Sequence, residues 1–217
     1  MKGVFTELWR GKDLYRIFMN TQCTNYAIRG KVVDIGSSLN RASYYRFLQT
    51  TPGVEVECLD LGFEGPASQK HIDLEKDLLP HADKTVDTVL LFNVLEHLYN
   101  FSLVLAESKR VLKSKGELIG AVPFLVAYHP DPHDYWRYTA ETLEKILTAQ
   151  GFGTVEIVPF GYGPFSAGFA QIEGILPRIL KILLVPLVFG MDRIITNWRP
   201  GLNEKKFSLG LFFRAVN

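Results

Sequence analysis

The chain has 217 residues, of which 47% are hydrophobic and 22% charged, and this composition is ordinary for one globular domain with a full core. Its 24 Lys and Arg against 23 Asp and Glu give a formal net charge of +1, which disfavours nucleic acid as a partner because no long-range positive field results. Two cysteines, Cys23 and Cys58, lie far apart without metal-ligand spacing, and no apolar leader opens the chain. We therefore expect a reduced, cytoplasmic protein, with the membrane surface as the other location left open.

A helical lead-in, residues 1–29, precedes the first expected strand. Within it, residues 4–22 space their apolar side chains as one or two amphipathic helices do, with an interruption near Gly11. An apolar strand follows over residues 31–35, and it carries one acid, Asp34. The pattern predicts helices that lead into the first strand of an α/β domain.

Small residues make the turn after this strand. Gly36, Ser37 and Ser38 suit a tight passage from the strand to a helix, which we expect over residues 41–49. Such a turn lets a ligand approach bare backbone, and the start of the next helix offers free N–H groups. The arrangement favours a nucleotide-type site, whereas a glycine needed only for the geometry of the turn is the alternative. The side chains expected to face inwards from that helix are Tyr44, Tyr45 and Leu48.

A second strand, residues 54–61, alternates apolar and polar side chains and carries Asp60 near its end. In a doubly wound sheet the carboxyl end of this strand lies beside the first turn, where a carboxylate can accept two hydrogen bonds from a ribose diol. A solvated acid at the end of a strand is the alternative. The polar connection that follows, residues 71–80, holds another acid, Asp73.

Residues 85–92 form an apolar run typical of a strand that is buried on both faces, and Asn93 comes directly after it. A helix is expected over residues 101–112, followed by a turn at 115–116 and a further strand at 117–122. Strands that alternate with helices in this way indicate a parallel sheet with covered faces.

Five stretches together resemble a class I S-adenosylmethionine-dependent methyltransferase: VVDIGSS, ECLDLG, HIDLEKDLLP, TVDTVLLFNVLEHL and LKSKGELIGAVPF. The resemblance covers residues 30–160 and is to the small-molecule and glycan branch of the superfamily. It implies an α/β, Rossmann-like, doubly wound fold, with a mostly parallel seven-stranded sheet and helices on both faces. It also implies a C-terminal helical insertion before an antiparallel last strand.

The resemblance implies S-adenosyl-L-methionine as the cofactor and assigns its contacts. In such proteins the first acid and its glycines hold the methionine end, the acid after the second strand takes the ribose, and an Asp in the next connection takes the adenine amine. The residue that closes the fourth strand lies under the sulfonium, and His97 is expected to make hydrogen bonds nearby. Carried onto this chain, the cofactor-binding residues are Asp34, Gly36, Ser38, Asp60, Leu61, Asp73, Leu74 and Asn93.

The first motif departs from the pattern of the family, Asp-x-Gly-x-Gly-x-Gly. This chain has Ser38 and Asn40 in place of the second and third glycines, and both are small or tolerant of positive φ. The departure leaves open a second function, a non-catalytic cofactor-binding or assembly subunit with the methyltransferase fold. An NAD-dependent enzyme is disfavoured because Gly-x-Gly-x-x-Gly is missing from the motif.

Residues 128–139, YHPDPHDYWRYT, carry the densest chemistry of the chain and follow the fifth strand of the core. Methyl transfer from a sulfonium to a hydroxyl requires an aligned acceptor, exclusion of water and removal of one proton. We expect His133 to be the base, oriented by Asp134 or Asp131, with His129 as the second candidate. A loop stiffened by its prolines, without catalytic side chains, is the alternative.

Side chains that bind the acceptor are expected in the same loop. Arg137 can hold a carboxylate or a phosphate, and the aromatic residues can stack on a sugar or another ring. An Arg137–Asp134 ion pair, and Thr139 as N-cap of a helix over 140–150, are the structural alternatives. We expect no metal, because methyl transfer needs none and the two histidines lack an evident third ligand. The expected substrate-binding residues are Tyr135, Trp136, Arg137 and Tyr138.

The C-terminal third holds an expected strand over residues 154–160 and ends with the expected last strand, residues 207–217. Between them, residues 161–206 form an insertion whose stretch 175–195 is strongly apolar. Its longest run without charge, residues 182–191, is too short to span a bilayer. Three roles stay open for the stretch: a lid or core helix, a homodimer contact, or a helix resting on a membrane surface.

The sequence thus predicts one methyltransferase domain over residues 1–217, with its cofactor-binding core at 30–160. The predicted reaction is methyl transfer from S-adenosylmethionine to a small-molecule or glycan-type acceptor, at oxygen and with a histidine base. A lipid-linked acceptor agrees with the membrane-surface alternative for the insertion.

Overall fold

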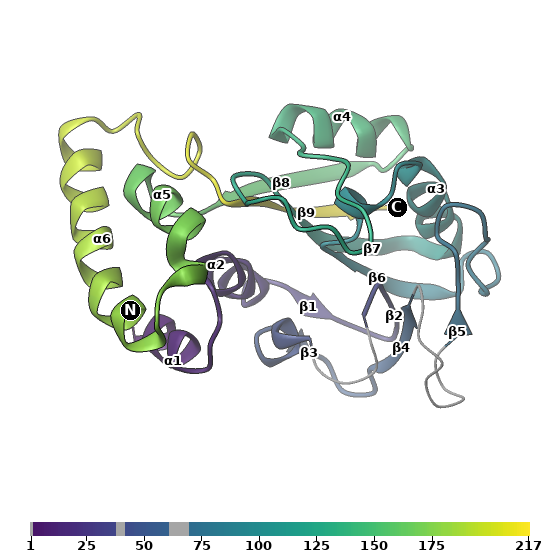
Figure 1. Ribbon diagram of the computed structural model, residues 1–217. Helices are drawn as coiled ribbons and strands as arrows, with labels where there is room; N and C mark the ends of the chain where they lie inside the picture. The colour runs from purple at the N-terminus through teal and green to yellow at the C-terminus, as the bar shows by residue number, and fades with distance from the viewer. Residues whose placement is uncertain (1, 38–41, 61–69) are drawn as a thin grey trace.

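The computed structural model describes residues 2–37, 42–60 and 70–217, and one central sheet organises them (Figure 1). In spatial order its strands are β5 (Lys70–His71), β4 (Glu55–Asp60), β2 (Lys31–Ile35), β6 (Val86–Phe92), β7 (Leu112–Pro123), β9 (Gly210–Val216) and β8 (Thr154–Phe160). The strands from β5 to β7 run parallel, and β9 lies antiparallel between β7 and β8. The predicted α/β fold, with a mostly parallel sheet and an antiparallel last strand, is confirmed. A separate pair of short strands, β1 (Ala27–Ile28) and β3 (Gln49–Thr50), lies beside it.

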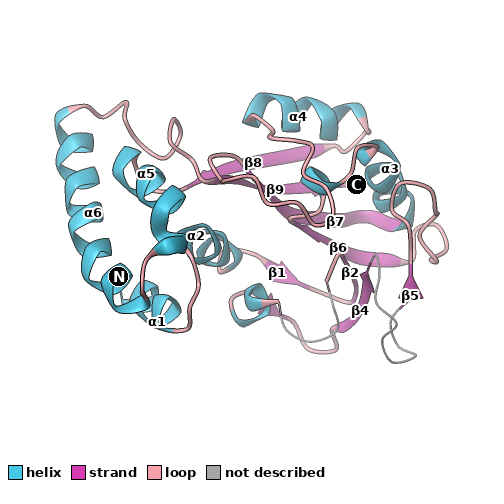
Figure 2. Ribbon diagram, viewed as in Figure 1, coloured by secondary structure: helices cyan, strands magenta, loops and turns pink. Residues whose placement is uncertain are grey.

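Helices cover both faces of this sheet (Figure 2). The apolar residues of α3 and α4 form one core with one face, and those of α1, α2, α5 and α6 form a second core with the other face. The α-helices are α1 (Lys2–Trp9), α2 (Leu14–Cys23), α3 (Phe101–Val111), α4 (Ala140–Ala149), α5 (Pro164–Ile172) and α6 (Arg178–Trp198). Three short 3₁₀ helices are η1 (Ser43–Arg46), η2 (Leu95–His97) and η3 (Glu173–Ile175).

Local sequence signals explain where several helices begin. The Asp13 carboxylate accepts a hydrogen bond from the Arg16 N–H and caps α2, after a turn in which Gly11 has φ +81°. The Thr139 hydroxyl caps α4 by accepting from the Thr142 N–H at 3.2 Å. The predicted interruption near Gly11 and the predicted N-cap at Thr139 are therefore confirmed.

The prediction of a helix over residues 41–49 is wrong. Its described part contains only η1, a single 3₁₀ turn, and β3 begins at Gln49 and pairs with β1. Four side-chain interactions favour the shorter turn over a helix. The side chains of Tyr44 and Tyr45 both reach Asp34, Ser43 bonds to Asn20, and Arg46 pairs with Glu7 at 2.6 Å. We infer that these tertiary contacts override the local preference for a longer helix.

Strand β7 starts earlier than expected, because Leu112 already pairs with Val86. The register then shifts, so that Thr88 faces Glu117, and the extra residues include Lys115 with φ +64°. The turn expected at residues 115–116 is thus an irregularity inside the strand. Beyond it, β7 pairs regularly with β6 and β9.

Two α-helices and one 3₁₀ helix, α5, η3 and α6, stand between β8 and β9, where the sequence predicts the apolar insertion. Asp192 of α6 accepts hydrogen bonds from the N–H groups of Phe165 and Ser166, at 2.7 and 2.9 Å, and so fixes α6 against the start of α5. Among the residues described here, no helix is both long enough and apolar enough to cross a membrane.

Candidate active site

The carboxyl ends of β2 and β6 lie side by side, because the chain leaves β2 for β4 on one flank and returns to β6 on the other. In such sheets ligands bind at the point where the order reverses. Gly36 follows β2 with φ +79°, and a Cβ added there would lie 2.5 Å from Cγ2 of Val94, which follows β6. The predicted need for glycine at position 36 therefore has a local cause, the close approach of two loops.

Asp34 of the first motif is fully buried, and two hydroxyls satisfy one of its oxygens. Tyr44 and Tyr45 donate to Oδ2 at 2.6 and 2.5 Å. Burial raises the pKa of Asp34 to about 6, although hydrogen bonds from both tyrosines and from Ser37 act to lower it. Tyr44 and Tyr45 are predicted to face inwards, and their hydroxyl groups do point inwards, onto the Asp34 carboxylate.

Asn93 follows β6 with φ +55°, a left-handed conformation that asparagine tolerates. Its N–H bonds to the Ala121 carbonyl at 2.9 Å, and its side-chain oxygen accepts a hydrogen bond from the hydroxyl of Tyr15 on α2. Helix α2 thus contacts the end of β6, where the sequence predicts the methionine part of the cofactor.

The other predicted cofactor residues differ in what surrounds them. Asp60 is the last residue of β4, one position beyond the pair Ile35–Leu59 that aligns β4 with β2. Asp73 binds its own turn instead: it accepts from the Glu75 N–H at 3.0 Å and from Lys76 at 2.7 Å. Leu74 is buried. Ser38 and Leu61 lie outside the described residues.

Hydrogen bonds fix the loop of residues 126–139 against η2. The Glu96 carbonyl accepts from the Tyr135 N–H at 2.7 Å, the Leu98 carbonyl from the Trp136 indole at 3.0 Å, and the Leu95 carbonyl from the Tyr138 hydroxyl at 3.0 Å. Tyr138 is buried in the core, so its predicted place in a wall that binds the acceptor is wrong. Trp136 is half-buried and packs on the same core.

Asp134 and Arg137 form a tight pair within this loop. Arg137 donates to both carboxylate oxygens of Asp134, at 2.5 and 2.8 Å, and these bonds lower the pKa of Asp134 to about 2. Asp134 also accepts from the His129 N–H at 2.9 Å, and its Oδ2 lies 3.5 Å from Nδ1 of His129. Arg137 is therefore occupied by the loop itself, as the structural alternative predicts.

These contacts correct one of the two predicted orienting acids, Asp134. Asp134 contacts His129 and not His133, because its carboxylate accepts hydrogen bonds from Arg137 and from the His129 N–H. The His133 ring is exposed and packs on the Tyr135 ring, with centroids 5.2 Å apart. Tyr135 also contacts Tyr99, so the exposed rim of the loop is aromatic, with Tyr99 67% and Tyr135 43% exposed.

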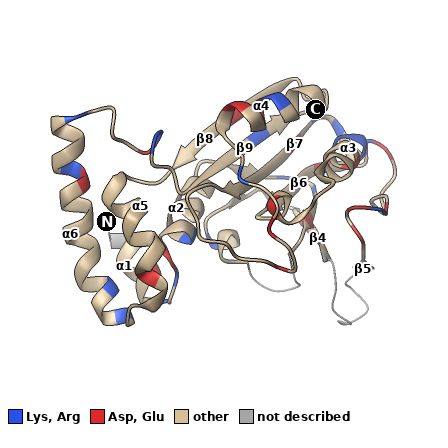
Figure 3. Cartoon of the chain, turned by 45° about the horizontal axis from the view of Figure 1, so that its top comes forward, with Lys and Arg blue, Asp and Glu red and all other residues tan. Residues whose placement is uncertain are grey.

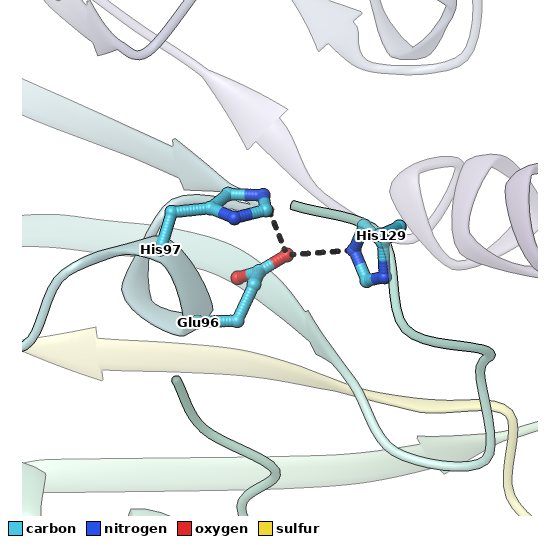
Figure 4. A group of neighbouring side chains, drawn as sticks. All are labelled: Glu96, His97 and His129. Carbon is cyan, nitrogen blue, oxygen red and sulfur yellow. Dashed lines mark ion pairs between the residues drawn. The ribbon is translucent and has the colours of Figure 1, made fainter. Parts of the chain in front are cut away.

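Sequence reasoning missed one group of side chains, which we call the Glu96 cluster: Glu96, His97 and His129 (Figure 4). Glu96 Oε1 lies 3.8 Å from Nε2 of His97 and 3.9 Å from Nε2 of His129. The nearby Glu96 carboxylate raises the pKa of His129. The adjacent Glu-His pair after the fourth strand was the available signal, but nothing in the sequence showed that the loop brings His129 to it.

A separate hollow lies at the amino ends of the parallel strands. It has a volume of about 700 Å³, and Arg29, Glu117 and Arg214 are among the residues that line it. These three form an ion-pair network, with Arg214 2.7 Å and Arg29 3.5 Å from Glu117. The network pairs these charges with one another. The hollow lies at the opposite end of the parallel strands from the predicted site, so the two are separate.

Comparisons with known proteins agree with this architecture. A family model described as a methyltransferase domain matches residues 49–120. A probable S-adenosylmethionine-dependent methyltransferase of Mycobacterium tuberculosis is 30% identical over 92 residues, 40% of this chain and 34% of that protein. An uncharacterized protein of Methanocaldococcus jannaschii is 52% identical over 134 residues, 60% of this chain and 50% of that protein. The chain thus spans half or less of the length of these two relatives.

A solved structure extends the likeness to almost the whole chain. The crystal structure of a SAM-dependent methyltransferase from Archaeoglobus fulgidus matches 99% of this chain and 93% of that one, with a TM-score of 0.55 and 16% identity. At that identity the likeness concerns the fold. Together with the family match, the relatives and the strand order, it shows that this chain is similar to class I S-adenosylmethionine-dependent methyltransferases in fold and, over part of its length, in sequence.

Proposed function

We propose that the protein transfers a methyl group from S-adenosyl-L-methionine to a hydroxyl oxygen of a small-molecule or glycan-type acceptor. One observation carries the proposal: Asp34, Asn93 and the loop 126–139 meet the carboxyl edge of β2, β6 and β7, beside the point where the strand order reverses. The relatives named as S-adenosylmethionine-dependent methyltransferases support the choice of cofactor.

The residues at the ends of β2, β4 and β6 are proposed to hold the cofactor. Asp34, kept in place by its two tyrosines, and Gly36 face the methionine end, with Asn93 beneath the sulfonium. Asp60, at the carboxyl end of β4, takes the ribose. Asp73 takes the adenine amine after releasing Lys76, whose exposed ammonium is replaceable by solvent.

S-adenosylmethionine supplies a methyl carbon already activated by its sulfonium. The chain has to align the acceptor, exclude water and remove one proton while the new O–CH₃ bond forms and the S–CH₃ bond breaks. His133 stays the proposed proton acceptor because its ring is exposed at the rim of the loop. The neighbouring rings of Tyr99 and Tyr135 provide the stacking surface for a sugar or other ring of the acceptor.

Calorimetric titration with S-adenosylmethionine and S-adenosylhomocysteine, with NAD as control, tests the cofactor. We expect both sulfur compounds to bind and NAD not to bind. Absence of binding would overturn the proposal and favour the non-catalytic alternative. Methyl transfer is then followed with labelled cofactor on a panel of hydroxylated sugars and phenols, with the matching amines as controls for the methylated atom.

Changing His133 to Ala tests the proton acceptor. We expect a loss of kcat of about 100-fold or more with unchanged cofactor affinity, since general bases contribute 10²–10⁴-fold. Unchanged kcat on the true acceptor would remove His133 from the mechanism.

A further inference from the structure

Glu96 is a buried acid whose side chain receives no hydrogen bond. It has no exposed surface, and neither of its carboxylate oxygens has a hydrogen-bond donor among the residues that the structure describes. A buried carboxylate without donors is costly, because its lost hydration is not replaced. A group that binds this carboxylate would remove the cost.

The two histidines beside Glu96 present lone pairs to it. Nδ1 of His97 lies 2.5 Å from the His133 carbonyl, and Nδ1 of His129 lies 2.9 Å from the Ala127 carbonyl. A carbonyl oxygen can only accept, so each Nδ1 carries a proton and donates. In a neutral imidazole the other nitrogen, Nε2, is then unprotonated, and both Nε2 atoms face Oε1 of Glu96 (Figure 4).

We propose that Glu96, His97 and His129 bind one divalent cation. All three ligand atoms lie within 4.8 Å of one another, so small side-chain rotations bring them to the 2.0–2.2 Å ligand distances of such a cation. Two imidazoles and one carboxylate favour a first-row transition metal or zinc over Mg²⁺ or Ca²⁺, which prefer oxygen ligands. Three protein ligands leave positions open for a water or an acceptor oxygen.

The surroundings of the cluster have the form expected around a metal site. Ligating histidines usually donate their second N–H to a carbonyl or carboxylate, which fixes the ring and the tautomer. His97 does so to the His133 carbonyl. His129 does so to the Ala127 carbonyl, with Asp134 Oδ2 3.5 Å from the same nitrogen. Arg137 also lies 3.3 Å from that nitrogen, but its closer bonds are to Asp134.

A catalytic use of the cation rests on the proposed methyltransferase function. Glu96 follows Asn93 by three residues, so the cation would lie near the proposed methyl group. An acceptor hydroxyl bound at an open position has a lowered pKa, and its proton passes to His133 or to water. The oxygen then attacks the methyl carbon as the S–CH₃ bond breaks. No electron is gained or lost.

Metal binding is tested without any activity. The full-length protein is stripped with EDTA and titrated with Mn²⁺, Co²⁺ and Zn²⁺ by calorimetry, and Co²⁺ is also followed by its visible absorption. We expect one equivalent to bind. Glu96→Gln and His129→Ala should each weaken metal binding by at least about 100-fold. Loss of a residue that only hydrogen-bonds to a ligand costs about 10–100-fold in metal affinity, and loss of the ligand itself costs more.

His133→Ala is the matched control, a histidine of the same loop outside the cluster, and its metal affinity should equal that of the wild type. Circular dichroism checks that each variant is folded. His129 is half-exposed, so we expect the fold to tolerate its substitution even if it does not tolerate that of Glu96. No uptake by the wild type, or uptake unchanged in both variants, would overturn the inference. Metal uptake without methyl transfer would overturn the proposed function alone, and methyl transfer without uptake would overturn the metal site alone.

A second surface is independent of this site. Of the seven large apolar side chains that α6 exposes, six recur every three or four residues and so form one stripe on the outer face of the helix. Figure 1 shows α6 at the far end of the molecule from β5. The stripe, which we call the α6 surface, consists of Ile179, Leu183, Leu187, Met191, Ile194 and Trp198.

The charges that α6 exposes are positive. Arg178 and Arg193 are exposed, Lys181 is half-buried, and Arg199 follows the last turn of the helix. Figure 3 shows blue Lys and Arg segments near both ends of α6. The single acid of the helix, Asp192, is buried and bound to the N–H groups of α5. An apolar stripe on a helix whose exposed charges are basic is complementary to an anionic lipid surface.

We infer that the α6 surface binds the surface of an anionic bilayer. Sedimentation of the full chain with phosphatidylcholine vesicles that contain 30% phosphatidylglycerol tests this, with pure phosphatidylcholine as control. We expect binding to the anionic vesicles, weakened by salt and lost in the double change Leu183→Glu and Leu187→Glu. Leu78→Glu, an equally exposed leucine far from α6 in the sequence, is the matched control. No vesicle binding, or dimers by analytical ultracentrifugation that the double change abolishes, would overturn the inference.

Discussion

Asp34 and Glu96 are both fully buried acids at the same edge of the sheet, yet they differ in the hydrogen bonds that their carboxylates accept. Asp34 receives two tyrosine hydroxyls from η1, whereas neither side-chain oxygen of Glu96 receives a donor within the described part of the chain. The protein satisfies Oδ2 of the first acid but not Oδ1, and it satisfies neither oxygen of the second. The second acid is therefore the one that a ligand would stabilise more.

The strongest test of this difference is Asp34→Ala. The change leaves the buried Tyr44 and the half-buried Tyr45 without an acceptor for their hydroxyls, so we expect the free energy of unfolding to fall by about 2–4 kcal/mol. Urea denaturation measures it, with Tyr45→Phe as a milder control that removes a single hydrogen bond. A loss no larger than that of the control would mean that the tyrosines do not depend on the acid.

Gly36→Ala tests whether the loops that carry the two acids need their close approach. The added methyl group meets Val94 and must adopt φ +79°, so we expect a loss of stability of about 2–3 kcal/mol. In the double variant with Val94→Ala, the steric part should be recovered and the backbone strain should remain. If the two changes are simply additive in thermal denaturation, the loops are not in contact.

Glu173 resembles Asp34, because one of its oxygens accepts from the Leu14 N–H at 2.9 Å and the other has no donor among the described residues. Burial raises its pKa to about 7 from 4.5. The folded state therefore keeps this proton longer than the unfolded state, and stability falls as the pH rises from 4.5 to 7. We expect Glu173→Gln to remove this loss and to be about 2 kcal/mol more stable than the wild type at pH 8. Denaturation at pH 4.5 and pH 8 measures the difference; parallel profiles would contradict it.

The smallest effect is expected from Glu96→Gln in the presence of EDTA. Removing a buried charge that has no donor should raise the free energy of unfolding by about 1 kcal/mol. With Mn²⁺ or Zn²⁺ added, the order should reverse, because only the wild type gains the stabilisation of a bound ligand. Lower stability of the variant in EDTA would indicate that protonated histidines already neutralise Glu96.

The strands and most helices could be predicted because their signals are local. The apolar run at residues 85–92, the acid at the start of α2 and Thr139 before α4 each act over a few residues. The helix expected over 41–49 failed because contacts with Asp34 and Glu7, distant in the sequence, decide that segment.

The candidate site was predicted at the level of the loop but not of its side chains. The density of titratable residues in 128–139 identified the loop, yet sequence alone does not tell which histidine Asp134 faces. Glu96 and His129 are 33 positions apart, and their proximity depends on how η2 and the loop bond to each other. Such a contact has no periodicity that a pattern could reveal.

The short turn η1 has a consequence for which cofactor this edge of the sheet favours. A pyrophosphate needs the aligned N–H groups at the start of a helix, and between β2 and α3 the described residues contain no α-helix, only 3₁₀ turns. In place of that positive end, the chain sets a buried acid and a pair of tyrosine rings beside the turn. An acid and aromatic faces attract a cationic centre and repel an anionic one. We therefore expect this edge to discriminate by the sign of charge, for a sulfonium and against a dinucleotide.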